Sequence, residues 1–343
     1  MAAPTPEKQI QFLTSIQRLL ADGQFVSTYK YALLLALADV SIERGDDSGE
    51  ALEINTHTLA AKFIAYYWRQ TAPYVPPGIE SQAEILRQNT GPQAAIVRLL
   101  EEARQRHAGS LFKAQHKVRE WALLISQVST VIRAMPLWKL QTVGRETVDF
   151  LYKNVGRGQA ISLRHGVAYC FRKFYVLIGD IVRGAWVRYI RRFNHGLLGT
   201  TEDLTEFLFG SERSNLQEVV PILREIQKDA CFYCGERMPN GSIDVDHFIP
   251  WSRYPLDLGH NFVLAHNRPC NSKKSDHIAA VRHLERWKER NEQQGQVLIA
   301  EFNRHRILFD LAKTQRIVNW AYEQTQKAGG LAWIRNDEFE RLP

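Results

Sequence analysis

The stretch from Cys231 to Asp276 gathers side chains that bind metal ions and transfer protons. It reads CFYCGERMPNGSIDVDHFIPWSRYPLDLGHNFVLAHNRPCNSKKSD and holds three of the four cysteines, an Asp-His pair and two further histidines. Thiolate and imidazole groups in paired spacings are typical zinc ligands, whereas carboxylate and amide oxygens suit hard ions such as Mg²⁺. The pattern therefore predicts two metal sites of different chemistry within one short module.

The thiol part of this stretch predicts a structural zinc site. Cys231 and Cys234 form one pair, and His266 and Cys270 supply the second, with three residues between them. A closed zinc site needs four such ligands, and the bound ion adds folding free energy to a small hairpin rich in Gly and Pro. The alternative reading places the three thiols in an apolar core.

The remaining residues resemble the HNH endonucleases, also called ββα-metal or His-Me finger nucleases. DVDHFIP supplies their strand-borne Asp-His pair, HNFVLAH their central asparagine, and CNSKKSD their ligand-bearing helix. Many members of this family also carry zinc-binding pairs of cysteines. The resemblance implies that Asn261 belongs to the catalytic centre in a structural role, because its side chain ties the loop that directs His247 inward.

Phosphodiester hydrolysis requires an activated water molecule and neutralisation of charge at the scissile phosphate. His247 is the candidate general base, since a neutral imidazole accepts a proton near pH 7. Asp246 and Asn271 offer oxygen ligands for Mg²⁺ or Mn²⁺. Because side chains alternate along a strand, Asp244 is expected on the same face as Asp246. It is a candidate carboxylate that supports the metal ligands without binding the ion itself.

Basic residues suggest where a nucleic acid would bind. Within the module, Lys273 and Lys274 are candidates for phosphate contacts, and solvated helix lysines are the alternative. The whole chain carries a net charge of +7, and residues 153–195 carry nine basic residues and one acidic residue. We expect a long amphipathic helix over residues 161–193, with either a phosphate-binding or a merely solvated basic face. Its basic residues are Arg172, Lys173, Arg183, Arg188 and Arg191.

The chain as a whole predicts an α+β protein that is mostly helical. Helical periodicity is clear at 7–21, 28–44 and 56–70. Tyr66, Tyr67 and Trp68 in the last of these are expected in a core, with base stacking as the alternative. The predicted segments are a helical N-terminal domain (1–135), a basic middle segment and connector (136–215), the HNH module (216–290) and a helical tail (291–343).

The expected function is metal-dependent endonucleolytic hydrolysis of DNA, in which a single module nicks one strand. RNA is not excluded as a substrate. By analogy the setting is restriction or anti-phage defence, with partner proteins bound through the N-terminal domain. The alternative is a zinc-stabilised nucleic-acid-binding module, or an effector subunit of a larger assembly, without cleavage of its own.

The same composition bears on the cellular compartment. No signal peptide is evident and no apolar run reaches 18 residues, so we expect a cytoplasmic protein with no membrane span. Three cysteines at metal-ligand spacing also favour a reducing compartment, and Cys170 is expected to be a buried thiol.

Overall fold

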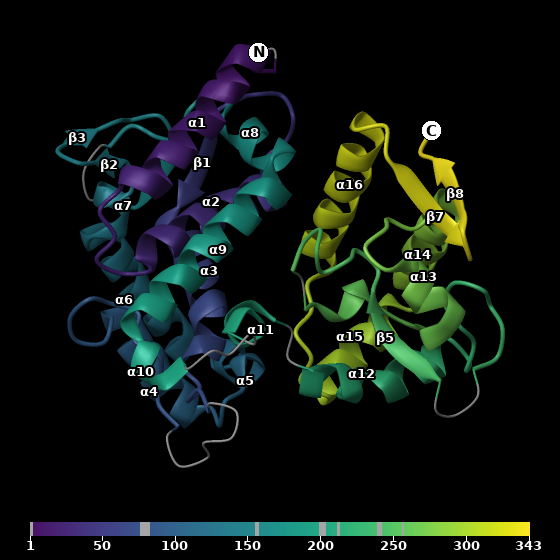
Figure 1. Cartoon of the computed structure of the whole chain (residues 1–343). Coiled ribbons are helices and arrows are strands. Elements are labelled where there is room, and N and C mark those ends of the chain that lie inside the picture. Colours follow the sequence, from purple (N-terminus) through teal and green to yellow (C-terminus); the bar gives the residue numbers. More distant parts are fainter. Residues whose placement is uncertain are drawn as a thin grey trace. The chain divides into compact units, whose positions relative to one another are not determined.

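The computed structural model is an α+β structure in which helices predominate, as the sequence predicts (Figure 1). It describes residues 3–75, 83–154, 158–198, 204–210, 213–238, 242–255 and 257–343. Backbone contacts divide the chain into two compact units, Met1–Gly210 and Ser211–Pro343. The boundary expected after residue 215 lies close to this division, whereas those expected after residues 135 and 290 fall inside the two units.

The first unit is built mainly of helices. These helices are α1 (Pro6–Asp22), α2 (Tyr29–Arg44), α3 (Thr56–Gln70), α4 (Ala95–Arg106), α5 (Leu111–His116), α6 (Val118–Ala134), α7 (Pro136–Lys139), α8 (Val167–Lys173), α9 (Tyr175–Phe193), α10 (His195–Leu198) and α11 (Leu204–Phe209). Its short strands are β1 (Leu52–Asn55), β2 (Thr142–Val143), β3 (Glu146–Thr147) and β4 (Ala160–Leu163). β1 pairs with β4 and β2 with β3, both antiparallel.

Helix α2 forms the centre of the first unit and is buried on all sides, as expected for a core helix (Figure 1). It carries two buried carboxylates, Asp39 and Glu43, which both pair with Lys62 of α3, at 2.9 and 2.5 Å. The hydroxyls of Tyr66 and Tyr175 donate to Asp39. The ammonium group and the two phenol hydroxyls thus offset the cost of burying these carboxylates.

The aromatic residues of α3 belong to this core, as the preferred interpretation of the sequence had it. Tyr67 is wholly buried and Trp68 is 2% exposed. The hydroxyl of Tyr66 donates a hydrogen bond to the buried Asp39. These aromatic rings stabilise the unit from within, and the alternative of a base-stacking surface is wrong for Tyr67 and Trp68.

The single long helix expected from residue 161 to residue 193 is wrong. Residues 160–163 form strand β4, in which Ile161 and Leu163 alternate with exposed Ser162. Gly166, at φ +81°, is the N-cap of α8, and a further break at Phe174 separates α8 from α9. The expected apolar face is real in α9, where the buried residues include Ile178, Val182, Ala185 and Tyr189.

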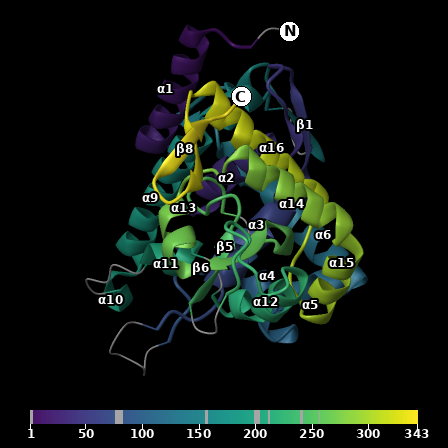
Figure 2. The same cartoon turned by 90° about the vertical axis from the view of Figure 1, so that its right-hand side faces the viewer.

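The second unit combines further α-helices with antiparallel hairpins (Figure 2). Its helices are α12 (Arg213–Ile226), the short α13 (Ser272–Lys274), α14 (Val281–Gln293), α15 (Gly295–Arg304) and α16 (Leu311–Lys327). Its strands are β5 (Ile243–His247), β6 (Phe262–His266), β7 (Leu331–Arg335) and β8 (Glu338–Arg341). A 3₁₀ turn η1 (Gly259–Asn261) precedes β6, and an irregular turn η2 (Asn267–Asn271), with extended backbone at Arg268, follows it.

The core of the second unit lies beneath the β5–β6 hairpin. Phe248 stacks on Trp287 of α14, with ring centroids 5.5 Å apart, and both side chains are buried. Within the part of the chain that the structure describes, no helix has the length and apolar character needed to cross a membrane.

Candidate metal centres and catalytic residues

Strand β5 presents the acidic residues and the histidine of the motif. It pairs with β6 in an antiparallel register that sets Asp244 opposite Ala265, Asp246 opposite Val263 and His247 opposite Phe262. β6 is almost wholly buried, so the hairpin is anchored by its second strand. The polar residues of β5 are therefore held on a fixed backbone.

Asn261 ties down the chain immediately after His247. Its Oδ1 accepts from the backbone N–H of Ile249 at 2.9 Å, and its Nδ2 donates to the carbonyl of the same residue at 3.2 Å. Its own carbonyl accepts from the N–H of Phe248 at 2.7 Å. Because Asn261 is fully buried, these bonds fix the loop that follows His247.

His247 is oriented by an acidic residue that the sequence did not single out. Its Nε2 lies 2.8 Å from Oδ1 of Asp257, and its ring packs against Trp251 and Phe262. With Nε2–H donated to the carboxylate, Nδ1 is the ring nitrogen with a lone pair to accept a proton. In the sequence, Asp257 is marked only by its place four residues before Asn261. A carboxylate at such a place is common in loops and does not indicate contact with a histidine.

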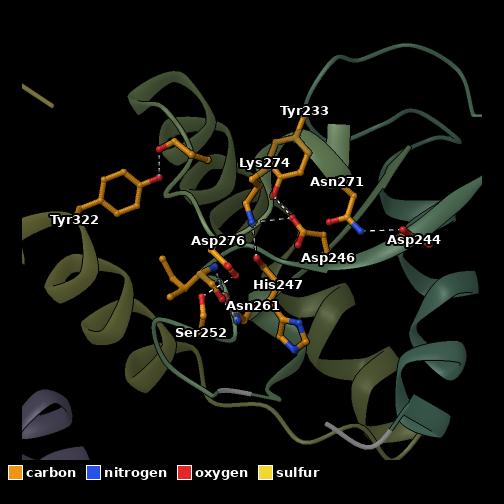
Figure 3. Close-up of polar contacts among 12 residues, drawn as sticks. Tyr233, Asp244, Asp246, His247, Ser252, Asn261, Asn271, Lys274, Asp276 and Tyr322 are labelled. Atoms are coloured by element: carbon orange, nitrogen blue, oxygen red, sulfur yellow. Dashed lines mark hydrogen bonds and ion pairs between the residues drawn. The ribbon is translucent and has the colours of Figure 1, made fainter. Parts of the chain in front are cut away.

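Asp246 is buried and holds two donors on one oxygen. Its Oδ2 accepts from the hydroxyl of Tyr233 at 2.5 Å and pairs with Nζ of Lys274 at 3.0 Å (Figure 3). Burial, and then the charge of Asp246, raise the pKa of Tyr233 well above its usual value of 10, so the phenol remains a donor.

Asn271 meets the strand from the turn that leads into α13. Its Nδ2 donates to Oδ2 of Asp244 at 2.9 Å, and in Figure 3 its amide oxygen points the other way, to the side of Asp246. Since an ionised carboxylate only accepts hydrogen bonds, Asp244 fixes which end of the amide faces Asp246. The oxygens left for a metal ion are Oδ1 of Asp246 and Oδ1 of Asn271, a donor set that fits Mg²⁺ or Mn²⁺.

Lys274 does not reach the surface, and the phosphate contact predicted for it is wrong. Its side chain is wholly buried, because the short helix α13 turns it against β5. Its Nζ pairs with Asp246 and donates to the carbonyl of His247 at 2.9 Å. The neighbouring Lys273 is exposed and pairs with Asp337 at 2.6 Å.

Arg172 likewise lies inside the first unit, so the phosphate contact predicted for it is also wrong. Its guanidinium pairs with Asp47 at 2.5 Å and donates to the carbonyls of Ile42 and Gly45. A cation at the end of α2 satisfies carbonyls that the helix itself leaves unpaired. The guanidinium is therefore part of the core of this unit.

The other predicted basic residues are at least partly open to solvent. Lys173, Arg188 and Arg191 are exposed. Arg183 is half-buried and pairs with Asp180 at 3.2 Å. These four side chains, with Lys273 in the second unit, are the predicted phosphate contacts that the structure leaves accessible.

Three cysteines and a histidine converge at the base of the β5–β6 hairpin. The ligand atoms of Cys231, Cys234, His266 and Cys270 all lie within 4.8 Å of one another. Nδ1 of His266 is 3.4 Å from Sγ of Cys234, so the imidazole faces the thiols. This Cys₃His cluster has the number and type of ligands that a closed zinc site requires.

The thiols of this cluster are close enough to share protons. A hydrogen bond from the Cys270 thiol lowers the pKa of Cys231, and the same contact raises the pKa of Cys270. Three sulfurs, one of them favoured as a thiolate, and one imidazole form a ligand set suited to Zn²⁺.

Helix α14 fastens the Cys₃His cluster and the β5–β6 hairpin to the core of the second unit. Arg286 donates to the carbonyls of Phe232 and Tyr233, which lie in the turn from Cys231 to Cys234, the cysteine turn. Arg290 donates to the carbonyls of His260 and Phe262, and burial lowers its pKa to about 10. The sequence of α14 predicts a charged, solvent-exposed helix, and no local pattern indicates that Arg286 and Arg290 point inward.

Comparison with known protein families matches both units. A model of HNH endonucleases matches residues 231–280, which contain the cluster and the residues of β5. A model described as a domain of unknown function, DUF8808, matches residues 9–207, more than half of the chain. No curated protein and no solved structure matches the chain.

Proposed function

The chain belongs to the DUF8808 family and carries an HNH endonuclease module, and from this premise we propose that it hydrolyses phosphodiester bonds of DNA with a divalent ion. The observation that carries the proposal is the orientation of Asn271. Asp244 turns its amide so that an oxygen, and not a nitrogen, stands beside Asp246. A carboxylate oxygen and an amide oxygen directed to one place are the ligands that a hard divalent ion prefers.

His247 acts as the general base in this proposal. Its Nε2–H is held by Asp257, so Nδ1 takes the proton of the attacking water. Asn261 keeps the loop in place, so the imidazole does not swing away from the phosphate. Trp251 and Phe262 pack against the imidazole ring and restrict its rotation.

Asp246 and Asn271 would hold the catalytic Mg²⁺ or Mn²⁺. A bound ion there supplies charge neutralisation at the scissile phosphate and stabilises the leaving oxygen. The Cys₃His cluster would hold a structural Zn²⁺ that keeps the cysteine turn folded. One module contains one such site, so each protomer cuts one strand and the product is a nick.

We assign the phosphate contacts to the accessible basic residues. In the first unit these are Lys173, Arg183, Arg188 and Arg191, and in the second Lys273. Arg and Lys contacts to phosphates position a duplex but carry no sequence information, so target choice must come from other contacts.

The proposed setting is restriction or anti-phage defence in the cytoplasm, with the first unit binding partner proteins. The support is the pairing of a nuclease module with a separate helical unit, and the thiol ligands, which persist in a reducing compartment. A bacterial host that expresses the protein should resist some phages, and the His247→Ala variant should not protect it.

The test of the activity is nicking of supercoiled plasmid in the presence of Mg²⁺. His247→Ala should slow conversion to nicked circles by roughly 10²- to 10⁴-fold. The matched control is His277→Ala, which removes an exposed histidine of the same module. A single-stranded RNA of the same sequence, cut faster than the plasmid, would reassign the substrate. Equal nicking by wild type and His247→Ala would refute the proposal.

A further inference from the structure

The two oxygens of Asp246 stand in different surroundings. Oδ2 receives the Tyr233 hydroxyl at 2.5 Å and the Lys274 ammonium at 3.0 Å. A carboxylate oxygen has two lone-pair positions, so these two donors use both of them. Oδ1 is therefore the oxygen that Asp246 has left to offer to a metal ion.

The two donors are held firmly by the surrounding structure. Tyr233 is 4% exposed, and its ring meets those of His283 and Trp333 edge-on, at 5.3 Å in each case. Lys274 has a second bond to the His247 carbonyl and lies 5.8 Å from the centre of the Tyr233 ring. Neither group can leave Oδ2 without disturbing the core.

We propose that Tyr233 and Lys274 are positioning residues that restrict Asp246 to one-oxygen coordination, and that they thereby set the preference of the site for Mg²⁺ or Mn²⁺ over Ca²⁺. The inference rests on the proposed function, since it concerns the same catalytic ion. It goes further by naming the residues that select the ion.

The selection follows from coordination chemistry. Ca²⁺ takes six to eight oxygens and readily binds both oxygens of one carboxylate, whereas Mg²⁺ is octahedral and keeps several waters. Mn²⁺ also suits octahedral oxygen sites. A carboxylate with one oxygen blocked therefore costs Ca²⁺ a ligand and costs the smaller ions none.

The position of Tyr233 also makes the selection of the metal ion depend on the cysteine turn. Tyr233 lies between Cys231 and Cys234, and its carbonyl is held by Arg286 of α14. The hydroxyl therefore has its place only when the cysteine turn is folded. For this reason zinc content must be measured in every variant.

The test is the ion preference of Tyr233→Phe in the full chain without DNA. Binding of Mn²⁺ is followed by loss of the free-ion electron paramagnetic resonance signal, and Ca²⁺ is added as the competitor. Asp246→Ala identifies the signal that belongs to this site. Tyr233→Phe should retain zinc and narrow the Mn²⁺-to-Ca²⁺ affinity ratio by about threefold to tenfold, the scale of one hydrogen bond.

The matched control is Tyr322→Phe, which removes another buried hydroxyl of the same unit, one that donates to the carbonyl of Ala279 (Figure 3). Its ratio should equal that of wild type. Should Tyr233→Phe lose zinc, Lys274→Met decides, because it frees Oδ2 from outside the cysteine turn and should narrow the ratio as well.

The outcomes separate this inference from the proposed function. An unchanged ratio in the zinc-loaded Tyr233→Phe variant overturns the inference alone, as does an equal change in Tyr322→Phe. In a zinc-depleted Tyr233→Phe, an unchanged ratio in Lys274→Met overturns it. Wild-type protein that binds no Mn²⁺ at a site sensitive to Asp246→Ala overturns the inference and the metal-dependent function together.

Discussion

Replacing Asp257 with alanine should slow nicking by about tenfold to a hundredfold at saturating DNA, with little change in DNA affinity. The reason is the 2.8 Å contact between Oδ1 of Asp257 and Nε2 of His247. Without it the ring turns more freely, and the nitrogen that accepts the proton of water is less often in place.

The expected loss of nicking rate follows from the strength of the hydrogen bond between Asp257 and His247. It is a hydrogen bond to a charged acceptor, and the side chains are only 13% and 29% exposed. Such bonds contribute about 1.5–3 kcal/mol, and each 1.36 kcal/mol of activation free energy changes a rate tenfold. The remaining contacts of the ring, with Trp251 and Phe262, limit the loss.

The assay is single-turnover nicking of supercoiled plasmid, beside a binding measurement with a short duplex. Asp257→Asn keeps an oxygen acceptor and should recover part of the rate. Ser252→Ala is the matched control, because it cuts another hydrogen bond of the same loop, the one to Asp276. In the His247→Ala background, Asp257→Ala should have no further effect. A further drop in that background would show that Asp257 acts independently of His247 and refute the reasoning.

Three further predictions concern zinc, the basic helix and acid stability. Purified protein should carry about one zinc ion per chain, and Cys231→Ser should lose it and unfold the second unit locally, whereas Cys170→Ser in the first unit should retain it; elemental analysis and limited proteolysis check both. Replacing three exposed or half-exposed arginines of α9 by glutamine should reduce the slope of log K for DNA binding against log salt concentration by roughly 2 to 3, at about 0.9 per phosphate contact, and an unchanged slope would show that this face is merely solvated. These are Arg183, Arg188 and Arg191. Burial, and secondarily Arg290, lower the pKa of His260 to about 4, with Asp310 acting in the opposite sense, so the unfolded chain binds a proton first as pH falls. The folded protein should therefore be most stable above pH 6.5 and lose stability between about pH 6.5 and 4. The His260→Phe variant should lose less stability over this range in thermal melts.

The chemistry of the module was largely predictable from its sequence because the relevant signals are local. A Cys-x-x-Cys pair, a strand with alternating acidic residues and a second ligand pair follow one another within Cys231–Asp276. Spacing along one chain limits which ligands can meet. The structure brings the four predicted zinc ligands together, including His266, whose spacing from Cys270 is one residue longer than in the usual pairs.

The partners of buried charges were not predictable, because they come from distant parts of the chain. Arg172 and Asp47 are 125 residues apart, and helical periodicity assigned that arginine to the solvent face. Periodicity reports hydrophobicity and not the carbonyls that a buried guanidinium can satisfy. The expected long helix failed for a related reason, since pairing with β1 decided that residues 160–163 form a strand.

The sequence by itself determined which atoms of the module can bind metals and move protons, since these follow from residue type and short spacing. Only the tertiary structure decided how those atoms are directed. It turned Lys274 inward onto Asp246, gave His247 its partner Asp257, and brought Tyr233 from the cysteine turn onto the same carboxylate. Hydrogen bonds depend on distances of a few tenths of an ångström, and those are set by packing across the whole unit.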